Sequence, residues 1–224
     1  MKKTLLFLVL VTVMLVSGCS STVKVTDSWK ADNINSIKNE KILVIARFDD
    51  MVSRQRFEQE IADRLREKGI DATESYKKFP SIKHNQKRSP GEIDKVIQII
   101  KNEGFEGVVL TVLKDLSKEV VTSETGGYTT GGYYPSHYGG YYGYFGGYYG
   151  SVYSPYGYGY GGTYVPAETR TYTSQTYKME TVVYNLMLEK GKQLLGIVSV
   201  DITDPDSASK VAPKYGDAVA DQWK

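Results

Sequence analysis

The stretch that decides the fold is Lys41-Ile-Leu-Val-Ile-Ala46, which is a continuous apolar run after its first lysine. A short run of this kind is typical of a strand that is buried on both faces of a sheet. A helix is predicted directly after it, over about residues 51–68, because apolar residues recur every four positions from Phe57 to Leu65. Gly69 fits the left-handed position that ends a helix. The segment therefore predicts a buried strand followed by an amphipathic helix.

The strand and helix pattern repeats downstream. Residues 70–76 are predicted to form a more polar strand that lies nearer a sheet edge. Ser89-Pro90-Gly91-Glu92 is a capping box with a proline at the first helical position, and Gly104 ends the helix that it opens. Residues 106–113 form a second fully buried strand. Right-handed crossovers then place the strand at 41–46 between the other two in a parallel sheet.

Two more strands are predicted near the C-terminal end, over residues 177–189 and 193–202, and Lys190-Gly191 between them is predicted to be a tight hairpin turn. Each strand is expected to carry its apolar side chains on one face: Val182, Tyr184, Leu186 and Leu188 on the first, and Leu194, Val198, Val200 and Ile202 on the second. A weak helical stretch follows near residues 215–223. We therefore predict an α/β fold, in which a mixed sheet combines a β-α-β-α-β unit with an antiparallel hairpin and is covered by helices.

The first 18 residues have the pattern of a secretory signal peptide, with a lysine pair before an apolar run over 4–16 and small residues after it. The run is shorter than the roughly 20 residues that a membrane span needs. The ending Leu15-Val-Ser-Gly-Cys19 resembles the bacterial lipobox, in which the cysteine is acylated and becomes the mature N-terminus. We expect cleavage before Cys19, acyl chains such as palmitate on Cys19, and a lipidated tether over 19–40. Within this tether, residues 22–26 alternate weakly and could form a short edge strand, and Trp29 is a candidate to dock on the core. The alternative is a free cysteine in an ordinary export leader.

The residue after the cysteine bears on localisation. In the sorting that the lipobox resemblance implies, Asp at this position favours the inner membrane, whereas Ser20 favours export to the outer membrane. A single acyl chain binds a bilayer reversibly, and two or more chains hold a protein there. We expect a lipid-anchored protein of the cell envelope, at the outer membrane, with its domain facing the periplasm. Cys19 is the only cysteine, so an intramolecular disulfide cannot form.

The charge balance argues against nucleic acid as a partner. Removing residues 1–18 takes away two lysines and no acid, which leaves 26 basic and 26 acidic side chains. A domain that binds nucleic acid usually carries a basic excess. The mature chain of about 205 residues has room for one domain or two small ones. We assign residues 41–124 and 168–224 to a single α/β domain.

Residues 125–167 form a low-complexity insert that holds 14 of the 19 tyrosines and 14 of the 22 glycines, with no Asp, Glu, Lys or Arg. Such a segment has little apolar area to offset the entropy of ordering glycine, so the core is not expected to hold it. Three interpretations stay open: a flexible excursion, an adhesive surface on which tyrosine rings stack, and part of an oligomeric outer-membrane barrel. The barrel ranks lowest, because lipid-facing strands need aliphatic residues at alternate positions. The partner-binding candidates of an adhesive surface are Tyr133, Tyr134, Tyr141, Tyr142, Tyr148 and Tyr149.

The sequence contains no recognisable catalytic arrangement. His84 and His137 lie in loops, without a second histidine or a cysteine at metal-ligand spacing. Residues 157–162 match G-x-G-x-x-G, but they neither follow a strong strand nor open a helix. Five aspartates at strand ends could in principle converge on calcium, although such residues are usually caps and turn formers: Asp49, Asp50, Asp201, Asp204 and Asp206. We predict no enzyme activity, no cofactor and no metal.

A family resemblance rests on short segments of the first half of the chain. These segments are Ser28-Trp29-Lys30, Lys41-Ile-Leu-Val-Ile45, Arg54-Gln-Arg56-Phe57-Glu58, Leu65, Gly69 and Ser75-Tyr76. The chain resembles an uncharacterised group of small bacterial outer-membrane lipoproteins. Their folded part is similar to the TolB amino-terminal domain, the curli secretion lipoprotein and the lipoprotein activators of penicillin-binding proteins. The resemblance implies a nucleotide-free α/β domain, and Cys19 is the only functional residue that it carries over.

Two classes of function follow from these observations. The first is a non-enzymatic envelope lipoprotein, anchored through Cys19, that binds a partner protein or a glycan at the outer membrane. The second is an oligomeric subunit of an outer-membrane secretion or transport assembly. The first predicts a monomer after solubilisation in detergent, and the second predicts a large ring.

Overall fold

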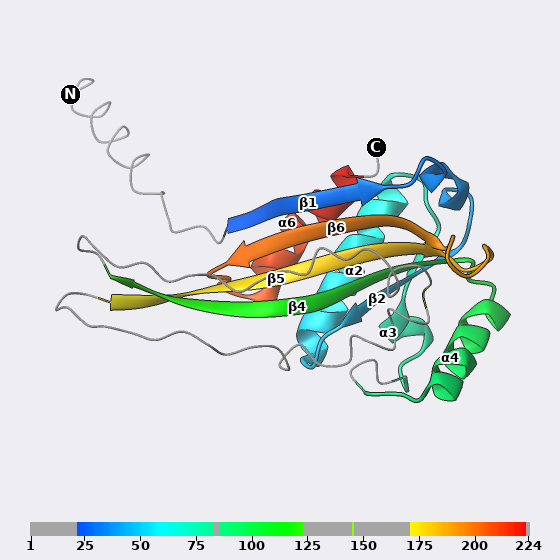
Figure 1. The fold of residues 1–224 in the computed structure, drawn as a ribbon, viewed down its shortest axis with the longest axis horizontal. Helices are drawn as coiled ribbons and strands as arrows, with labels where there is room; N and C mark the ends of the chain where they lie inside the picture. Colours follow the sequence, from blue (N-terminus) through cyan, green and yellow to red (C-terminus); the bar gives the residue numbers. More distant parts are fainter. Residues whose placement is uncertain (1–21, 83–85, 123–144, 146–170, 223–224) are drawn as a thin grey trace, which may run out of the picture.

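The computed structural model describes residues 22–82, 86–122, 145 and 171–222. These residues form a six-stranded mixed sheet in the order β1-β6-β5-β4-β2-β3 (Figure 1). Its strands are β1 (Thr22–Lys30), β2 (Ile42–Arg47), β3 (Ala72–Glu74), β4 (Gly107–Thr122), β5 (Thr171–Asn185) and β6 (Leu194–Thr203). The helical elements are η1 (Ile34–Ile37), α2 (Met51–Glu67), α3 (Ser75–Lys78), α4 (Pro90–Asn102) and α6 (Ala208–Asp221).

The predicted fold class is confirmed. Strand β2 lies between β3 and β4 and is parallel to both, while β5 and β6 form an antiparallel hairpin beside β4. The helix boundaries follow the sequence signals, since Gly69 and Gly104 have φ angles of +80° and +79° directly after α2 and α4. At the start of α4, the Glu92 carboxylate accepts hydrogen bonds from the N–H and the hydroxyl of Ser89, at 2.8 and 2.7 Å. Local backbone chemistry therefore sets where these helices begin and end.

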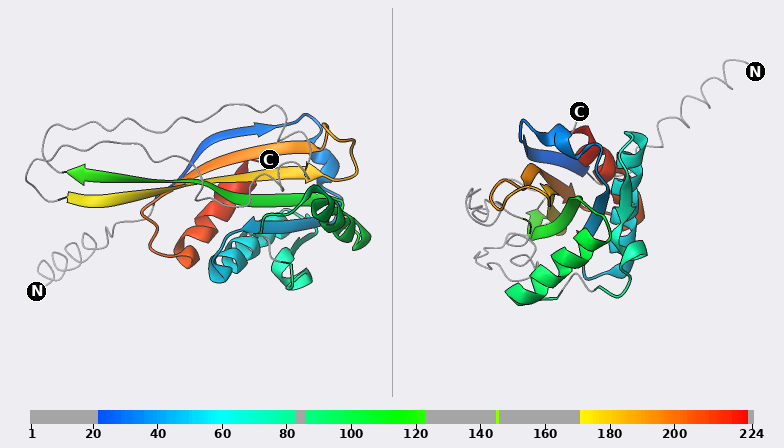
Figure 2. Two further views of the ribbon diagram at one scale, coloured as in Figure 1. Left: turned by 60° about the horizontal axis from the view of Figure 1, so that its bottom comes forward. Right: turned by 90° about the vertical axis from the view of Figure 1, so that its right-hand side faces the viewer.

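Helices cover the sheet on both faces (Figure 2). Alternate residues of β2 enter two separate cores: Val44 and Ala46 pack with α2 and α6, and Leu43 and Ile45 pack with α4. The C-terminal helix α6 packs on the same face of the sheet as α2. It is fixed there by the buried Tyr215, whose hydroxyl lies 2.7 Å from the Thr181 hydroxyl in β5. Burial raises the pKa of the Tyr215 phenol above its usual value. The sequence indicates this helix only weakly and over 215–223. The helix begins earlier, at Ala208, and Val211, Tyr215 and Val219 are buried along one stripe.

The folded domain starts earlier than the sequence predicts. Residues 22–30, assigned above to a tether, form the edge strand β1, which pairs antiparallel with β6 from Thr22↔Thr203 to Lys30↔Gly196. Ile37 in η1 is buried in the core beside α2. Trp29, in contrast, does not dock on the core and is 47% exposed. The chain therefore enters the sheet at Thr22 and not at Lys41, and only Ser20 and Ser21 separate Cys19 from β1 in the sequence.

Other predicted boundaries also change. The strand predicted over 70–76 is reduced to Ala72–Glu74, because the chain turns into α3 at Ser75. The predicted two-residue turn at Lys190-Gly191 is part of a longer connection between Asn185 and Leu194, in which Gly191 has a φ of +93°.

The apolar faces predicted for the hairpin are correct only in part. Val183 pairs with Gly196 and Tyr184 with Leu194, so Leu195 is an extra residue that forms a bulge. The bulge reverses the alternation, and Leu194 packs in the α4 core although Val198 packs in the α2 core. Leu188 likewise lies against the α2 core, because it follows the end of β5 and no longer alternates with the strand.

Strands β4 and β5 continue beyond the rest of the sheet (Figure 1). Strand β2 pairs with β4 only as far as Val112, and β6 pairs with β5 only from Thr176 onward. Five further pairs, from Lys118↔Gln175 to Thr122↔Thr171, extend β4 and β5 as a two-stranded ribbon. We refer to residues 118–122 and 171–175 as the ribbon. It projects about 17 Å, given a rise of about 3.4 Å per residue.

One residue of the Gly/Tyr insert is described, and it lies in the core. Phe145 is fully buried against Tyr184, with ring centroids 5.6 Å apart, and its backbone N–H donates to the Gln193 side-chain oxygen at 3.2 Å. The expectation that the core holds none of the insert is therefore wrong at this position. The reason is that a phenylalanine combines a large apolar area, which glycine lacks, with no hydroxyl that would need a hydrogen-bond partner, as a buried tyrosine does.

Candidate functional site

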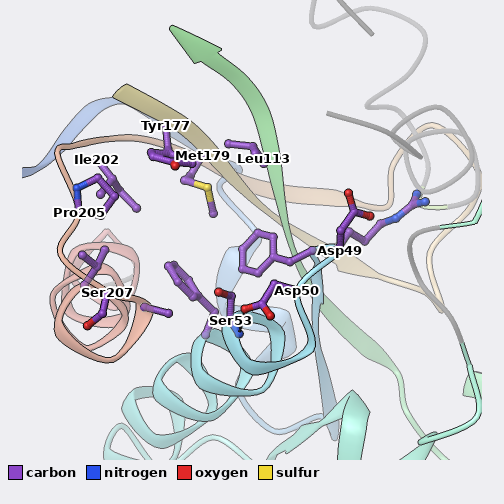
Figure 3. Close-up of a pocket in the computed structure, with 14 residues that line it drawn as sticks. Asp49, Asp50, Ser53, Leu113, Tyr177, Met179, Ile202, Pro205 and Ser207 are labelled. Carbon is purple, nitrogen blue, oxygen red and sulfur yellow. Dashed lines mark hydrogen bonds between the residues drawn. The ribbon is translucent and has the colours of Figure 1, made fainter. Parts of the chain in front are cut away.

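An apolar cleft lies at the carboxyl end of β2, where Phe48, Asp49 and Asp50 leave the sheet before α2 (Figure 3). In open α/β sheets, ligands bind outside the carboxyl ends of the strands, so this is the expected place for a site. The cleft has a volume of about 390 Å³. That volume falls within the range of about 300–1,000 Å³ for small-molecule sites.

The walls of the cleft come from four parts of the fold and are mainly apolar. The apolar lining residues are Phe48, Phe57, Leu113, Met179, Ile202, Pro205, Ala208 and Val211. The floor is rigid, because the Phe57 ring packs edge-to-face on Phe48 at 5.0 Å and contacts Tyr215 at 5.2 Å. Leu113, Tyr177 and Ile202 come from β4, β5 and β6, at the level where the ribbon leaves the sheet. The cleft is therefore enclosed by the sheet on one side and by α2 and α6 on the other.

The first turns of α2 and α6 form the polar rim of the cleft. The Asp50 carboxylate accepts from the Ser53 N–H at 2.7 Å, and the Ser207 hydroxyl accepts from the Lys210 N–H at 3.4 Å. The hydrogen bonds from Ser53 hold the pKa of the Asp50 carboxyl below its usual value. Each helix N-terminus is thus capped by its own side chain. With Asp49 and Asp50 at the rim, the site does not favour an anion.

A buried polar network fixes α2 against the end of β2. The Glu58 carboxylate accepts from the Ala46 N–H at 3.0 Å, the Tyr76 N–H at 2.8 Å, the Ser75 hydroxyl at 2.7 Å and the Arg54 Nε at 3.0 Å. Burial raises the pKa of the Glu58 carboxyl, and these donors act in the opposite direction. The four donors belong to β2, α2 and α3, and none of them lines the cleft. The network therefore fixes the position of α2, which forms one wall of the cleft.

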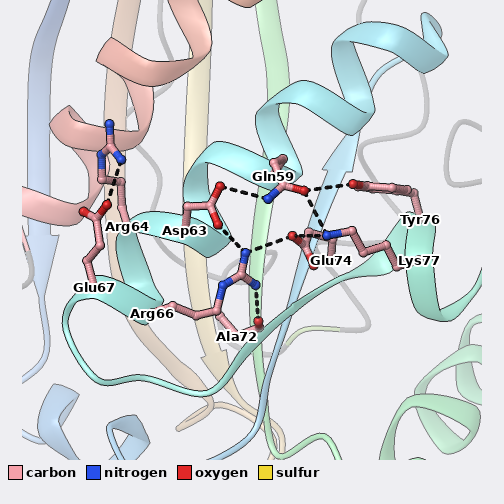
Figure 4. A network of polar contacts seen from close by, with 9 residues as sticks. All are labelled: Gln59, Asp63, Arg64, Arg66, Glu67, Ala72, Glu74, Tyr76 and Lys77. Carbon is pink, nitrogen blue, oxygen red and sulfur yellow. Dashed lines mark hydrogen bonds and ion pairs between the residues drawn. The ribbon is translucent and has the colours of Figure 1, made fainter.

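A second polar network closes the other end of α2 (Figure 4). The Arg66 guanidinium binds the Asp63 and Glu74 carboxylates and donates to the Ala72 carbonyl. Lys77 also binds Glu74, at 2.8 Å. These contacts tie the C-terminal end of α2 to β3 and α3. Their charges are paired with one another on the protein, which is typical of a structural network.

The residues singled out in the sequence are distributed as follows. Cys19, both histidines and the six candidate tyrosines lie outside the described residues. Asp49 and Asp50 line the cleft, Asp204 accepts from the Ser174 hydroxyl and the Gln175 N–H, and Asp206 pairs with Lys210. In the described part of the chain, no three His, Cys, Asp or Glu side chains lie close enough to hold a metal ion. The five aspartates, all of which are described, therefore do not form a cluster of this kind.

The cleft itself was missed in the sequence. The position of the cleft could have been predicted from the strand order. In an open α/β sheet, ligands bind outside the carboxyl ends of the parallel strands, and β2 is the central one. The lining residues could not be identified, because Tyr177, Ile202 and Val211 reach the cleft only through the pairing of β5 and β6 and the packing of α6.

Comparisons with known proteins add little to this geometry. No family model and no curated protein matches the chain. Among solved structures, a variant PelC dodecamer from Paraburkholderia phytofirmans matches with 11% identity and a TM-score of 0.41, covering 89% of this chain and 96% of that chain. A PelC dodecamer from the same organism has 10% identity and a TM-score of 0.40, covering 91% and 97%. We draw no functional conclusion from similarities this low. Within the described residues, none of the helices is both long and apolar enough to cross a membrane.

Proposed function

We propose that the protein is a non-enzymatic envelope lipoprotein, anchored at the outer membrane by acyl chains on Cys19, that binds a partner protein or a glycan there. The observation that carries the proposal is the short distance between the anchor and the domain. Cys19 precedes the first residue of β1 by three positions, a span of at most about 10 Å. An acylated Cys19 would therefore hold one particular end of the domain at the bilayer.

The pairing of the strands identifies that end. Thr22 pairs with Thr203, Thr203 with Thr176, and Thr176 with Ser117, so these residues form one row across the sheet. Strand β1 is parallel to β5, because each is antiparallel to β6. The N-terminal end of β1 and the ribbon therefore lie at the same end of the sheet. The anchor, the ribbon and the apolar cleft all belong to the same end of the molecule, which we call the anchor end.

The cleft supports a binding role and not a catalytic one. Catalysis by a side chain needs a nucleophile or an acid–base group in a position to react. Three of the polar side chains that line the cleft have structural roles: Asp50 and Ser207 cap helices, and Arg47 donates to the Gln86 carbonyl. The remaining lining is mainly aliphatic and aromatic, which suits the binding of an apolar group.

The anchor is tested by metabolic labelling of the full chain with palmitate. We expect incorporation into the wild-type protein and none into Cys19→Ser, and we expect Cys19→Ser to move from the membrane to the soluble fraction. Two or more chains hold a protein on a bilayer, whereas the domain alone has no such anchor. Retention of Cys19→Ser on the membrane, or absence of label in the wild type, would contradict the proposed anchor.

The partner is tested by crosslinking whole envelopes and isolating the protein. We propose the six candidate tyrosines as the contact, so a variant with Ser at 133, 134, 141, 142, 148 and 149 should lose crosslinked partners that the wild type captures. Phe145 is kept in this variant because it is part of the core. Phe145→Ala, with the six tyrosines intact, controls for disturbance of the fold. An unchanged set of partners in the serine variant would exclude the tyrosines as the contact.

The alternative function, a subunit of an oligomeric secretion or transport assembly, is distinguished by size. Under our proposal, the acylated protein in detergent has the mass of a monomer. A ring of many subunits would favour the alternative. Light scattering coupled to size-exclusion chromatography, with the detergent contribution subtracted, gives the mass of the protein part.

A further inference from the structure

We propose that one acyl chain of the lipidated Cys19 lies in the apolar cleft of the same molecule. The inference rests on the proposed function, because it requires acylation of Cys19. It adds a ligand for the cleft and a second location for the anchor, besides the bilayer.

The chemistry of the cleft fits an aliphatic chain. Its deepest lining residues, Met179, Ile202 and Val211, are almost completely buried and apolar. Leu113 and Phe48 extend this lining toward the opening. Each buried methylene of a ligand contributes about 0.8 kcal/mol in surroundings of this kind. The favourable interaction is therefore with hydrocarbon.

The rim argues against a phosphate or a carboxylate as the ligand. A helix N-terminus attracts an anion when its N–H groups are open. Here, Asp50 and Ser207 occupy that position on α2 and α6. The Asp49 and Asp50 carboxylates also carry the same sign as an anion, and Arg47, the cation of the lining, is turned to the Gln86 carbonyl, to which it donates. An uncharged hydrocarbon avoids both costs.

The length of chain before the domain brings the Cys19 lipid within reach. Val23 in β1 pairs with Ile202 in β6, and both side chains pack in the core on the α2 side. Cys19 lies four residues before Val23, at most about 14 Å away, and paired strands are about 5 Å apart. An acyl chain that spans one leaflet of a hydrocarbon core about 30 Å thick is about 15 Å long. These lengths allow a chain on Cys19 to reach Ile202.

The tether also decides between the Cys19 lipid and other lipids. A short flexible linker gives an attached group an effective concentration in the millimolar range at a nearby site. The side of the cleft nearest to Cys19 is formed by β6 and α6, because β6 pairs with β1 and α6 also contacts β1. Ile202 in β6 and Ala208 in α6 line the cleft on this side. An acyl chain on Cys19 would therefore enter the cleft between these two elements.

The test uses the full chain, produced in cells that are fed a palmitate analogue with a photoreactive diazirine in its chain. After illumination, peptide mass spectrometry should find crosslinks from Cys19 to peptides that contain Leu113 or Ile202, in a product of monomer mass. Ala208→Trp, which fills the cleft from the first residue of α6, should abolish these crosslinks while Cys19 keeps its label. Ala218→Trp on the same helix, outside the cleft, is the matched control and should retain them.

The outcomes separate this inference from the proposed function. Label on Cys19 with crosslinks to lipid alone would overturn the inference and leave the anchor intact. Crosslinks between two chains would also overturn it, since the occupant would be the lipid of a second copy. Absence of label on Cys19 would overturn the proposed function itself, and the inference with it. Wild-type crosslinks to the cleft decide the question even if Ala208→Trp fails to fold.

Discussion

At the scale of single residues, Glu58 is the most constrained polar group in the described structure. Its side chain is fully buried and accepts four hydrogen bonds, from the backbone of Ala46 and Tyr76 and from the side chains of Arg54 and Ser75. It therefore joins three elements, β2, α2 and α3. A buried acceptor shared by several donors is costly to remove, because every donor loses its partner at once.

We expect Glu58→Ala to lower the free energy of unfolding by about 3–5 kcal/mol, the usual cost of removing one partner from a buried ion pair. The matched control is Glu67→Ala on the same helix. Glu67 is 64% exposed and pairs with Arg64 at 3.2 Å, so its loss should cost at most about 1 kcal/mol. Urea unfolding of the purified protein measures both. Equal effects of the two substitutions would show that the buried network does not hold α2.

Phe145 is the second residue whose role is defined by burial. It contacts Tyr184 in the core on the α4 side, within a segment of the chain that is otherwise made of glycine, tyrosine and small residues. Its burial gives the insert one fixed point on the domain.

Phe145→Ala should destabilise the protein by about 3–5 kcal/mol, because it removes a large buried side chain and leaves a cavity. Phe145→Leu keeps most of the apolar volume and should cost less than about 1.5 kcal/mol. The midpoint of urea unfolding, at constant slope, reports the difference. If alanine at this position were as stable as phenylalanine, Phe145 would not be part of the core.

At the scale of elements, the N-terminus of α2 is both a helix cap and part of the cleft rim. Asp50 accepts hydrogen bonds from the Ser53 side chain and from the Ser53 N–H, and these lower the pKa of its carboxyl in the folded state. An acid with a lowered folded pKa stabilises the protein above its unfolded pKa of about 3.9. That stabilisation is lost as the pH falls through the folded pKa.

The expected result is a pH-dependent difference between Asp50 and Asp50→Asn. Asparagine keeps a capping oxygen but carries no charge, so at pH 7 the wild type should be slightly more stable, and the difference should disappear as the pH falls below about 4. Asp50→Ala removes the cap and should cost about 0.5–2 kcal/mol at pH 7. Thermal unfolding of the three proteins between pH 3 and 7 tests this. A difference that grows on acidification would contradict the direction of the pKa shift.

The elements also show which features of a fold a sequence reveals. Strands β2 and β4 were predicted because their runs are apolar on both faces, and α4 because Ser89 and Glu92 form a capping box. Strand β1 is only weakly indicated, as a short edge strand over 22–26 within the predicted tether, because its second half is exposed and carries no apolar alternation. The outer part of β4, with Lys118 and Glu119 exposed, was missed for the same reason. The bulge at Leu195 depends on cross-strand pairing, which periodicity cannot report.

At the scale of the whole molecule, the two ends of the sheet differ. The anchor end carries the start of β1, the ribbon and the apolar cleft. The opposite end carries the connection between β5 and β6. Each end presents an exposed apolar side chain on a strand or its connection: Val120 on the ribbon is 55% exposed, and Met187 after β5 is 61% exposed. The two residues are therefore a matched pair of reporters for the orientation of the domain on a membrane.

If Cys19 anchors the domain as we propose, the ribbon lies nearer to the bilayer than the β5–β6 connection. Cys19 is the only cysteine, and acylation blocks its thiol, so Val120→Cys and Met187→Cys each introduce a single reactive thiol. A fluorescent dye at position 120 should be quenched by nitroxide headgroup lipids in vesicles that carry the acylated protein, and a dye at position 187 should not. The sheet spans more than ten residues of β5 between these levels, about 40 Å, so the contrast should be large. Equal quenching at both positions would mean that the domain lies flat on the bilayer, and stronger quenching at 187 would reverse the proposed orientation.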